Sequence, residues 1–92
     1  VTGISAPASL IQNFTIHPLP QPGTYQARAT LRTPQKAWLG IFDLQGREVQ
    51  RLEIQNGTEL IFEWSMLAWP RGVYLLRLEN KNGVLGSRLW VR

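Results

Sequence analysis

Alternation of apolar and polar residues with a period of two constrains the fold of this chain more than any other feature. In the segment TYQARATLRT (24–33), the side chains of Tyr25, Ala27, Ala29 and Leu31 alternate with polar ones. Successive side chains of a β-strand point to opposite faces, so this pattern indicates a strand with one dry and one wet face. Further segments that alternate, or are apolar on both faces, lie at 12–17, 36–43, 47–54, 58–64, 73–80 and 84–91. About seven strands at this spacing predict an all-β fold, an immunoglobulin-like antiparallel β-sandwich.

Turn-forming residues separate these segments. The prolines of PLPQPG (18–23) interrupt the chain because proline cannot donate to a strand ladder. Asn56–Gly57 predicts a hairpin between 47–54 and 58–64, and KNG (81–83) predicts another between the last two strands. The apolar residues of 47–54 change phase, which predicts a β-bulge near Gln50–Arg51. At most a single turn of helix is expected, at 5–12 or 65–68.

The chain is expected to form one domain over 1–92, with 1–12 as a linker or first short segment and 13–92 as the sandwich. Its one methionine is Met66, so we expect the chain to be part of a longer protein. The alternation predicts exposed side chains at Arg28, Arg32 and Glu59. It predicts these core residues: Phe14, Ile16, Leu39, Ile41, Leu60, Phe62, Leu76 and Leu78.

The composition argues against catalysis and against a metal or cofactor site. The chain has no cysteine and one histidine, His17, so it lacks the ligands of a multi-residue zinc site. A catalytic triad would need His17, Asp43 and a serine, and no serine lies in a nucleophile-elbow motif. The net charge of +4 comes from scattered Lys and Arg, which does not favour nucleic-acid binding. No apolar run approaches the roughly 18 residues of a membrane span.

Tryptophan is abundant for a chain of this length. Trp38 and Trp64 lie in mid-strand, and we expect both to be packed in the core. Trp69 and Trp90 lie in a connection and in the last strand, so their roles stay open between packing and an exposed binding surface.

Three motifs occur in a fixed order: F-x-I-x-P-x-P at 14–20, IFDLQGREV at 41–49 and L-x-x-x-x-G-V-Y-L-L-R-L at 67–78. Together with the basic, aliphatic last strand they resemble the C-terminal sorting domain (type A) of proteins exported by the type IX secretion system of Bacteroidetes. Pro-Leu-Pro stands here where the family typically has Pro-Asn-Pro, and arginines replace lysines in the last strand. The family positions that match are Pro18, Pro20, Asp43, Gly46, Arg47, Val49, Leu67, Gly72, Tyr74, Arg88, Leu89, Val91 and Arg92.

The resemblance implies a sorting signal, covalently linked to an upstream cargo protein. Its implied partners are an outer-membrane translocon and a sortase-like peptidase, which cuts the domain off or attaches the cargo to the cell surface. The cargo would pass through the periplasm to the cell surface or the medium. Most of the recognition is expected in Leu67–Arg92, with Arg88 and Arg92 as candidate contacts. For Gly46, Gly72 and Tyr74 a structural role is favoured over direct recognition.

Two other functions remain open from the residues alone. A carbohydrate-binding or adhesive β-sandwich appended to a secreted enzyme would present exposed, coplanar tryptophans. A plain spacer domain would have further chain on both sides.

Overall fold

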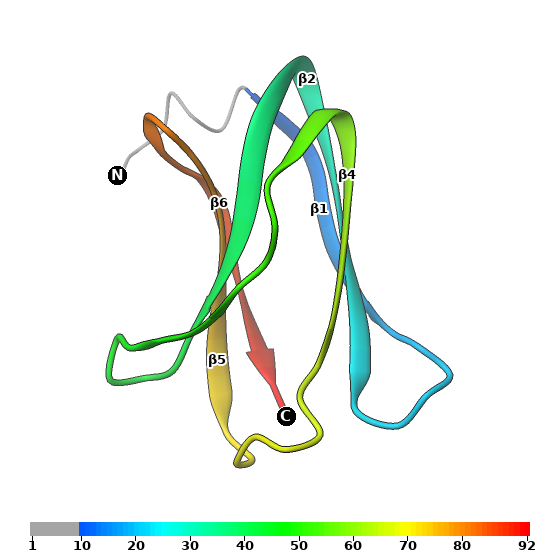
Figure 1. The fold of residues 1–92 in the computed structure, drawn as a ribbon, viewed down its shortest axis with the longest axis vertical. Coiled ribbons are helices and arrows are strands. Elements are labelled where there is room, and N and C mark those ends of the chain that lie inside the picture. Colours follow the sequence, from blue (N-terminus) through cyan, green and yellow to red (C-terminus); the bar gives the residue numbers. More distant parts are fainter. Residues whose placement is uncertain (1–9) are drawn as a thin grey trace.

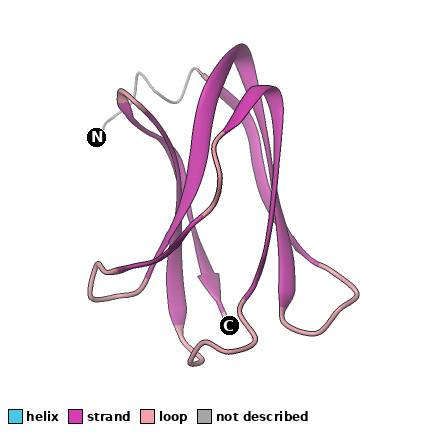
Figure 2. Cartoon of the chain, viewed as in Figure 1, coloured by secondary structure: helices cyan, strands magenta, loops and turns pink. Residues whose placement is uncertain are grey.

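The structure, a computed structural model, describes residues 10–92, which form strands and turns without a helix (Figures 1 and 2). These residues accordingly contain no helix long and apolar enough to cross a bilayer. The helical turn expected at 5–12 lies mostly outside the described residues, and residues 11 and 12 already belong to the first strand. The strands are β1 (Ile11–Pro18), β2 (Thr24–Phe42), β3 (Glu48–Arg51), β4 (Gln55–Ser65), β5 (Val73–Asn80) and β6 (Gly83–Val91).

One long strand, β2, belongs to both layers of the fold. Its first part, residues 25–30, lies between β1 and β4. Its last part, residues 40–42, lies between β3 and β5, and β6 follows at the edge beyond β5. All of these pairs are antiparallel, and the sheet curls so that its two parts face each other (Figure 1). The expected antiparallel β-sandwich is confirmed, with six strands in place of about seven.

The strand count differs because segments 24–33 and 36–43 are continuous in β2. Thr30 lies opposite Glu59 and Gln35 opposite Gly57, so β2 has extra residues at this point. Pro34 lies among them, where the lack of a backbone N–H costs no ladder bond because the pairing is already interrupted. The interruption lets one strand pass from one layer to the other.

The prediction of a hairpin at Asn56–Gly57 is wrong. Both residues lie inside β4 and pair with Lys36 and Gln35 of β2. Gly57 has a φ of 136°, which a glycine adopts readily, but it uses this freedom where β4 follows the bend of β2. β3 and β4 therefore pair side by side with β2 rather than with each other. The expected bulge is present in β3, with Val49 as the extra residue between Glu48 and Gln50.

The core lies between the two layers. All eight expected core residues are buried, and Leu39, Ile41, Leu60, Leu76 and Leu78 are fully enclosed. Full burial of such side chains typically contributes about 1.5–3 kcal/mol each. The residues expected at the surface, Arg28, Arg32 and Glu59, are exposed.

The tryptophans expected in the core differ from each other. Trp64 is buried, whereas Trp38 is half-buried on the outer face of β2. The Arg51 guanidinium covers the Trp38 ring at 5.4 Å from its centroid, and Arg77 covers Phe42 on the same face at 4.5 Å. The apolar outer face of this central strand is therefore covered by long basic side chains rather than by another sheet.

One end of the sandwich collects the connections that carry the sequence motifs. The loops 19–23, 43–47 and 66–72 and the final residue Arg92 lie together at the lower end in Figure 1. We call this the motif end. The β5–β6 turn and the bend of β2 lie at the opposite end, where the chain also enters β1 (Figure 1).

Candidate functional site

The β2–β3 turn is organised around the carboxylate of Asp43. This carboxylate accepts hydrogen bonds from the backbone N–H groups of Gln45 (2.9 Å) and Arg47 (3.0 Å) and from Nε of Arg47 (2.9 Å). Gly46 completes the turn with a φ of 84°, a backbone conformation that is strained for residues with a side chain. Its backbone N–H donates a hydrogen bond to the Asp43 carbonyl. The Asp-x-x-Gly-Arg motif thus satisfies its own polar groups.

Two opposing influences act on the pKa of Asp43. Desolvation of the carboxyl raises the pKa. The hydrogen bonds and the positive charge of Arg47, together with the hydrogen bond from Gln45, lower the pKa by more than desolvation raises it. The net result is a pKa below the ordinary value of 3.8, so the carboxylate form is favoured in the folded turn.

The second motif, Gly72-x-Tyr74, closes the other side of the same end. The Tyr74 hydroxyl donates to the Pro70 carbonyl at 2.6 Å, and the Tyr74 ring packs against Trp69 with 5.5 Å between centroids. Gly72 exchanges two backbone hydrogen bonds with Arg92. The motif therefore ties the β4–β5 loop to the last residue of the chain.

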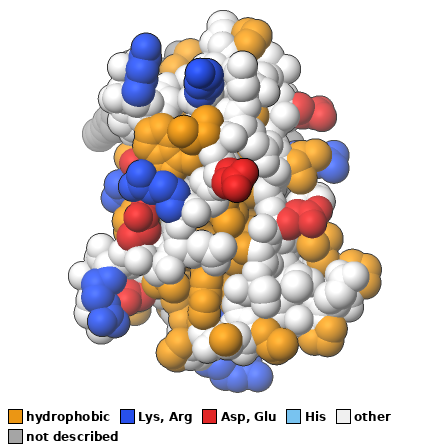
Figure 3. Space-filling model, in the orientation of Figure 1, with side chains coloured by type: hydrophobic (Ala, Val, Ile, Leu, Met, Phe, Trp, Pro, Cys, Tyr) orange, Lys and Arg blue, Asp and Glu red, His pale blue; other side chains and the backbone are white. Residues whose placement is uncertain are grey.

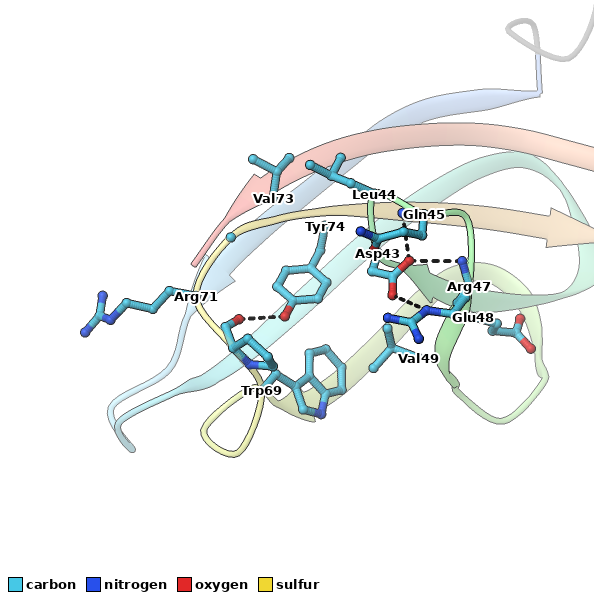
Figure 4. Close-up of a pocket in the computed structure, with 12 residues that line it drawn as sticks. Asp43, Leu44, Gln45, Arg47, Glu48, Val49, Trp69, Arg71, Val73 and Tyr74 are labelled. Carbon is cyan, nitrogen blue, oxygen red and sulfur yellow. Dashed lines mark hydrogen bonds and ion pairs between the residues drawn. The ribbon is translucent and has the colours of Figure 1, made fainter.

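The two motifs meet in a cleft of about 520 Å³ (Figure 4). Asp43 and Arg47 line one wall, and Gly72 and Tyr74 line the other. Trp69 also lines the cleft. Residues about thirty positions apart in the sequence are thereby brought to one place. The structure joins five of the matching family positions here, with Val49 as the fifth, and Gly46 lies in the adjoining turn.

The candidate prolines lie at the motif end but outside this cleft. Pro18 ends β1 opposite Tyr25, and Pro20 is exposed in the following loop. Gly23 ends this loop and accepts a hydrogen bond from the Met66 N–H at 2.7 Å, which holds the loop against the β4–β5 connection. The loop that carries the prolines is therefore held beside the β4–β5 connection.

The basic residues of the last strand are engaged in contacts within the domain. Arg88 donates from Nη1 to the Phe14 carbonyl of β1 at 3.0 Å. Arg92 donates to the Met66 and Leu67 carbonyls, at 3.1 Å for the Leu67 bond. These charge-assisted bonds connect β6 to other parts of the sandwich. The arginines expected to face a partner thus serve first to hold the strand in place.

The aliphatic residues of this strand have the opposite environment. Leu89 is 65% exposed and Val91 is 71% exposed, although the run Leu89–Trp90–Val91 reads as core in the sequence. Leu89 lies opposite Leu75 of β5, and Val91 lies opposite Val73. These four residues form an apolar strip on the outer face of the terminal hairpin. Hydrophobic side chains also reach the surface at the motif end, at the bottom of Figure 3.

This strip is not among the surfaces predicted from the sequence. Strict alternation would have indicated it, because Arg88, Trp90 and Arg92 share one face and Leu89 and Val91 the other. Trp90, which is half-buried, packs edge-on against Tyr25 with 5.4 Å between centroids and marks the inward face.

His17 is the histidine considered above for a metal site or a catalytic triad. His17 is exposed and contacts the Thr15 hydroxyl at 3.1 Å. The described part of the chain has no group of three or more His, Asp or Glu side chains placed to hold a metal ion.

Comparison with known proteins agrees with these motifs. The family model described as "Secretion system C-terminal sorting domain" matches residues 15–92. A search of curated proteins found no match to the chain. The matched region contains all three motif-bearing loops and the terminal hairpin. The chain therefore belongs to the family of type IX secretion C-terminal sorting domains, which direct export of the protein that carries them to the cell surface or the extracellular space.

Proposed function

We propose that the outer-membrane translocon of the type IX system reads this domain in its folded state, at the apolar strip of Val73, Leu75, Leu89 and Val91. The observation that carries this proposal is the exposure of Leu89 (65%) and Val91 (71%) in an otherwise well-anchored strand. Apolar side chains on the surface of a hairpin whose backbone is already ordered form a binding surface with little further loss of backbone conformational freedom on binding.

The contacts of the two terminal arginines support this choice of surface. Both guanidinium groups already donate to backbone carbonyls of the domain. A partner that used the same donors would have to break these bonds, which hold β6 against β1 and the β4–β5 loop. A partner that contacts the aliphatic side chains would not have to break these hydrogen bonds.

The position of the chain entry supports reading from the motif end. The described chain enters β1 at the opposite end of the sandwich from Arg92 (Figure 1). A cargo joined before β1 would extend from that opposite end and leave the terminal hairpin accessible. We further propose that a sortase-like peptidase cuts before β1 after translocation, which releases the cargo or allows its attachment to the cell surface.

The tryptophans give little support to a carbohydrate-binding module. Trp64 is buried, and Trp38, Trp69 and Trp90 are half-buried. Trp69 packs at an angle of 44° against Tyr74, and Trp90 packs edge-on against Tyr25. A sugar platform needs an accessible ring face, and these rings are used for packing.

An export assay tests the proposal. Residues 1–92 are fused to the C-terminus of a passenger with its own inner-membrane signal and expressed in a host with a type IX system. The passenger is expected outside the outer membrane, and in the periplasm when the domain is omitted or the translocon is deleted. Cleavage is expected to shorten the exported product by about the 10.5 kDa of the domain. A passenger that stays in the periplasm with the intact domain would contradict the proposal.

A further inference from the structure

We propose that the edge of β6 binds an extended strand of the translocon receptor, which adds to the sheet beside β6. The strand expected there carries aliphatic residues on one face and acidic residues on the other. This inference rests on the proposed function, since it specifies how the receptor contacts the terminal hairpin.

Backbone geometry places unused hydrogen-bonding groups along this edge. Gly72 and Arg92 exchange both of their backbone hydrogen bonds, which sets the phase of the β5–β6 ladder. Bonded and non-bonded pairs alternate in an antiparallel ladder. Hence the N–H and C=O groups of Ser87, Leu89 and Val91 point away from β5, and β5 is the strand that pairs with β6 among the described residues.

Within the part of the chain that the structure describes, residues 87–91 of this edge lack three common protections against strand addition. Natural edge strands are often protected by lysine, proline or a bulge. The segment SRLWV (87–91) has neither lysine nor proline, and the register irregularity of this hairpin lies at Leu78/Glu79, toward the other end of β6. The one charged side chain in it, Arg88, is bonded to the Phe14 carbonyl.

A groove runs between β6 and β1 beside this edge. It has a volume of about 360 Å³ and is lined by residues 11–14 and 85–88. Gly86 lies at this groove, where a Cβ would come within 2.6 Å of Cδ1 at the flexible end of the Ile11 side chain. Inward-facing side chains of an added strand would enter this groove.

The side chains beside the edge define the chemistry of the occupant. On the outer face, Leu89 and Val91 favour aliphatic neighbours in the added strand. On the inner face, Arg88 and Arg92 are the charged residues, and residues 83–92 contain no acid. Acidic side chains in the added strand would therefore meet the positive charge of both guanidinium groups, which persists while each group donates to its backbone carbonyl, and would meet no acid of β6.

The first test uses a synthetic probe and the ¹⁵N-labelled chain of residues 1–92. The probe is a capped heptapeptide that alternates valine and glutamate, and the control peptide has the same composition with the valines grouped together. The alternating peptide is expected to shift the amide resonances of Ser87, Leu89 and Val91 at millimolar concentration, with the control peptide weaker. No shift, or shifts centred on the cleft at Trp69, would overturn the inference. Shifts at β6 that follow protein concentration without peptide would also overturn it, because a second copy would then occupy the edge.

The second test removes one outward donor. Ser87→Pro deletes an N–H that the β5–β6 ladder does not use, while Ser87→Ala removes the hydroxyl and keeps that N–H. In the export assay, Ser87→Pro is expected to lower export about two- to tenfold, the loss of one hydrogen bond, while Ser87→Ala exports normally. Equal export of the two variants would overturn the inference. If Ser87→Pro does not fold, the peptide test decides.

The two proposals fail in different ways. Export of the unaltered fusion without peptide binding at β6 would overturn strand addition and leave the sorting function standing. Peptide binding at β6 by a domain that exports nothing would overturn the proposed receptor.

Discussion

Along β6, the inward and outward side chains have different environments. Trp90 and the two arginines contact other parts of the sandwich, whereas Leu89 and Val91 are largely exposed. Because strand side chains alternate between faces, one row of residues anchors the strand and the other row remains available. A strand can in this way be fixed by the fold and present a recognition surface at the same time.

Because the inward row anchors β6, substitutions in that row cannot separate an effect on folding from an effect on recognition. Reversing the charge of Arg88 or Arg92 would remove donors from the Phe14, Met66 and Leu67 carbonyls. Loss of export in such a variant would therefore report on stability as well as on recognition. Substitutions in the outward row avoid this ambiguity.

Removing the inward aromatic anchor is expected to destabilise the domain most. Trp90→Ala deletes the ring that packs at 5.4 Å from Tyr25. Because Trp90 is half-buried, we expect a loss of about 2–3 kcal/mol, below that of a fully buried ring. Chemical denaturation measures this loss. An unchanged denaturation midpoint would contradict the assignment of Trp90 to the inward row.

Removing the guanidinium of Arg92 is expected to have an intermediate effect. Arg92→Met keeps most of the aliphatic stem but loses the bonds to the Met66 and Leu67 carbonyls. We expect a loss of about 1–2 kcal/mol in the free energy of unfolding. Arg71→Met, which alters an exposed arginine of the β4–β5 loop, serves as the control and is expected to change stability by less than about 0.5 kcal/mol. Equal stability of the two variants would show that the Arg92 contacts do not hold β6.

Removing the Asp43 charge is expected to have a smaller, pH-dependent effect. The pKa of Asp43 is lowered in the folded state, so its contribution is present above the ordinary value of 3.8 and is lost as the pH falls through the folded-state pKa. Asp43→Asn is expected to lower the thermal midpoint at pH 7, and the difference from the unaltered domain should close at pH values below about 4. A difference that stays constant with pH would mean that the charge of Asp43 is not the cause.

Period-two alternation was sufficient to predict the β-sandwich, the core and the terminal hairpin. It identified Ile41 and Leu76, for example, because each lies in a strand with a consistent buried face. The motifs that resemble the sorting-domain family pointed to the Asp43 turn and the Gly72–Tyr74 segment, but not to their shared cleft, because the cleft forms only where the β2–β3 turn and the β4–β5 loop come together in the fold.

Other features depended on contacts between distant strands. Asn56–Gly57 is a strong local turn signal, yet β4 continues through it because β2 supplies a pairing partner. The run Leu89–Trp90–Val91 is apolar on both faces, as is the run containing Trp38 in β2. The sequence does not show that Arg51 and Arg77 cover the outer face of β2 while the outer face of β6 stays open.

The most direct test of the recognition surface is export by the double variant Leu89→Thr, Val91→Thr. Threonine is β-branched and therefore suited to a strand, but it replaces the apolar surface, so stability should change by no more than about 0.5 kcal/mol per site. Val84→Thr alters an exposed residue of the same strand near the opposite end and is the matched control. With folding checked by denaturation, the double variant is expected to leave the passenger in the periplasm while Val84→Thr exports it. Normal export of the folded double variant would contradict the claim that the outward row of β6 is read by the translocon.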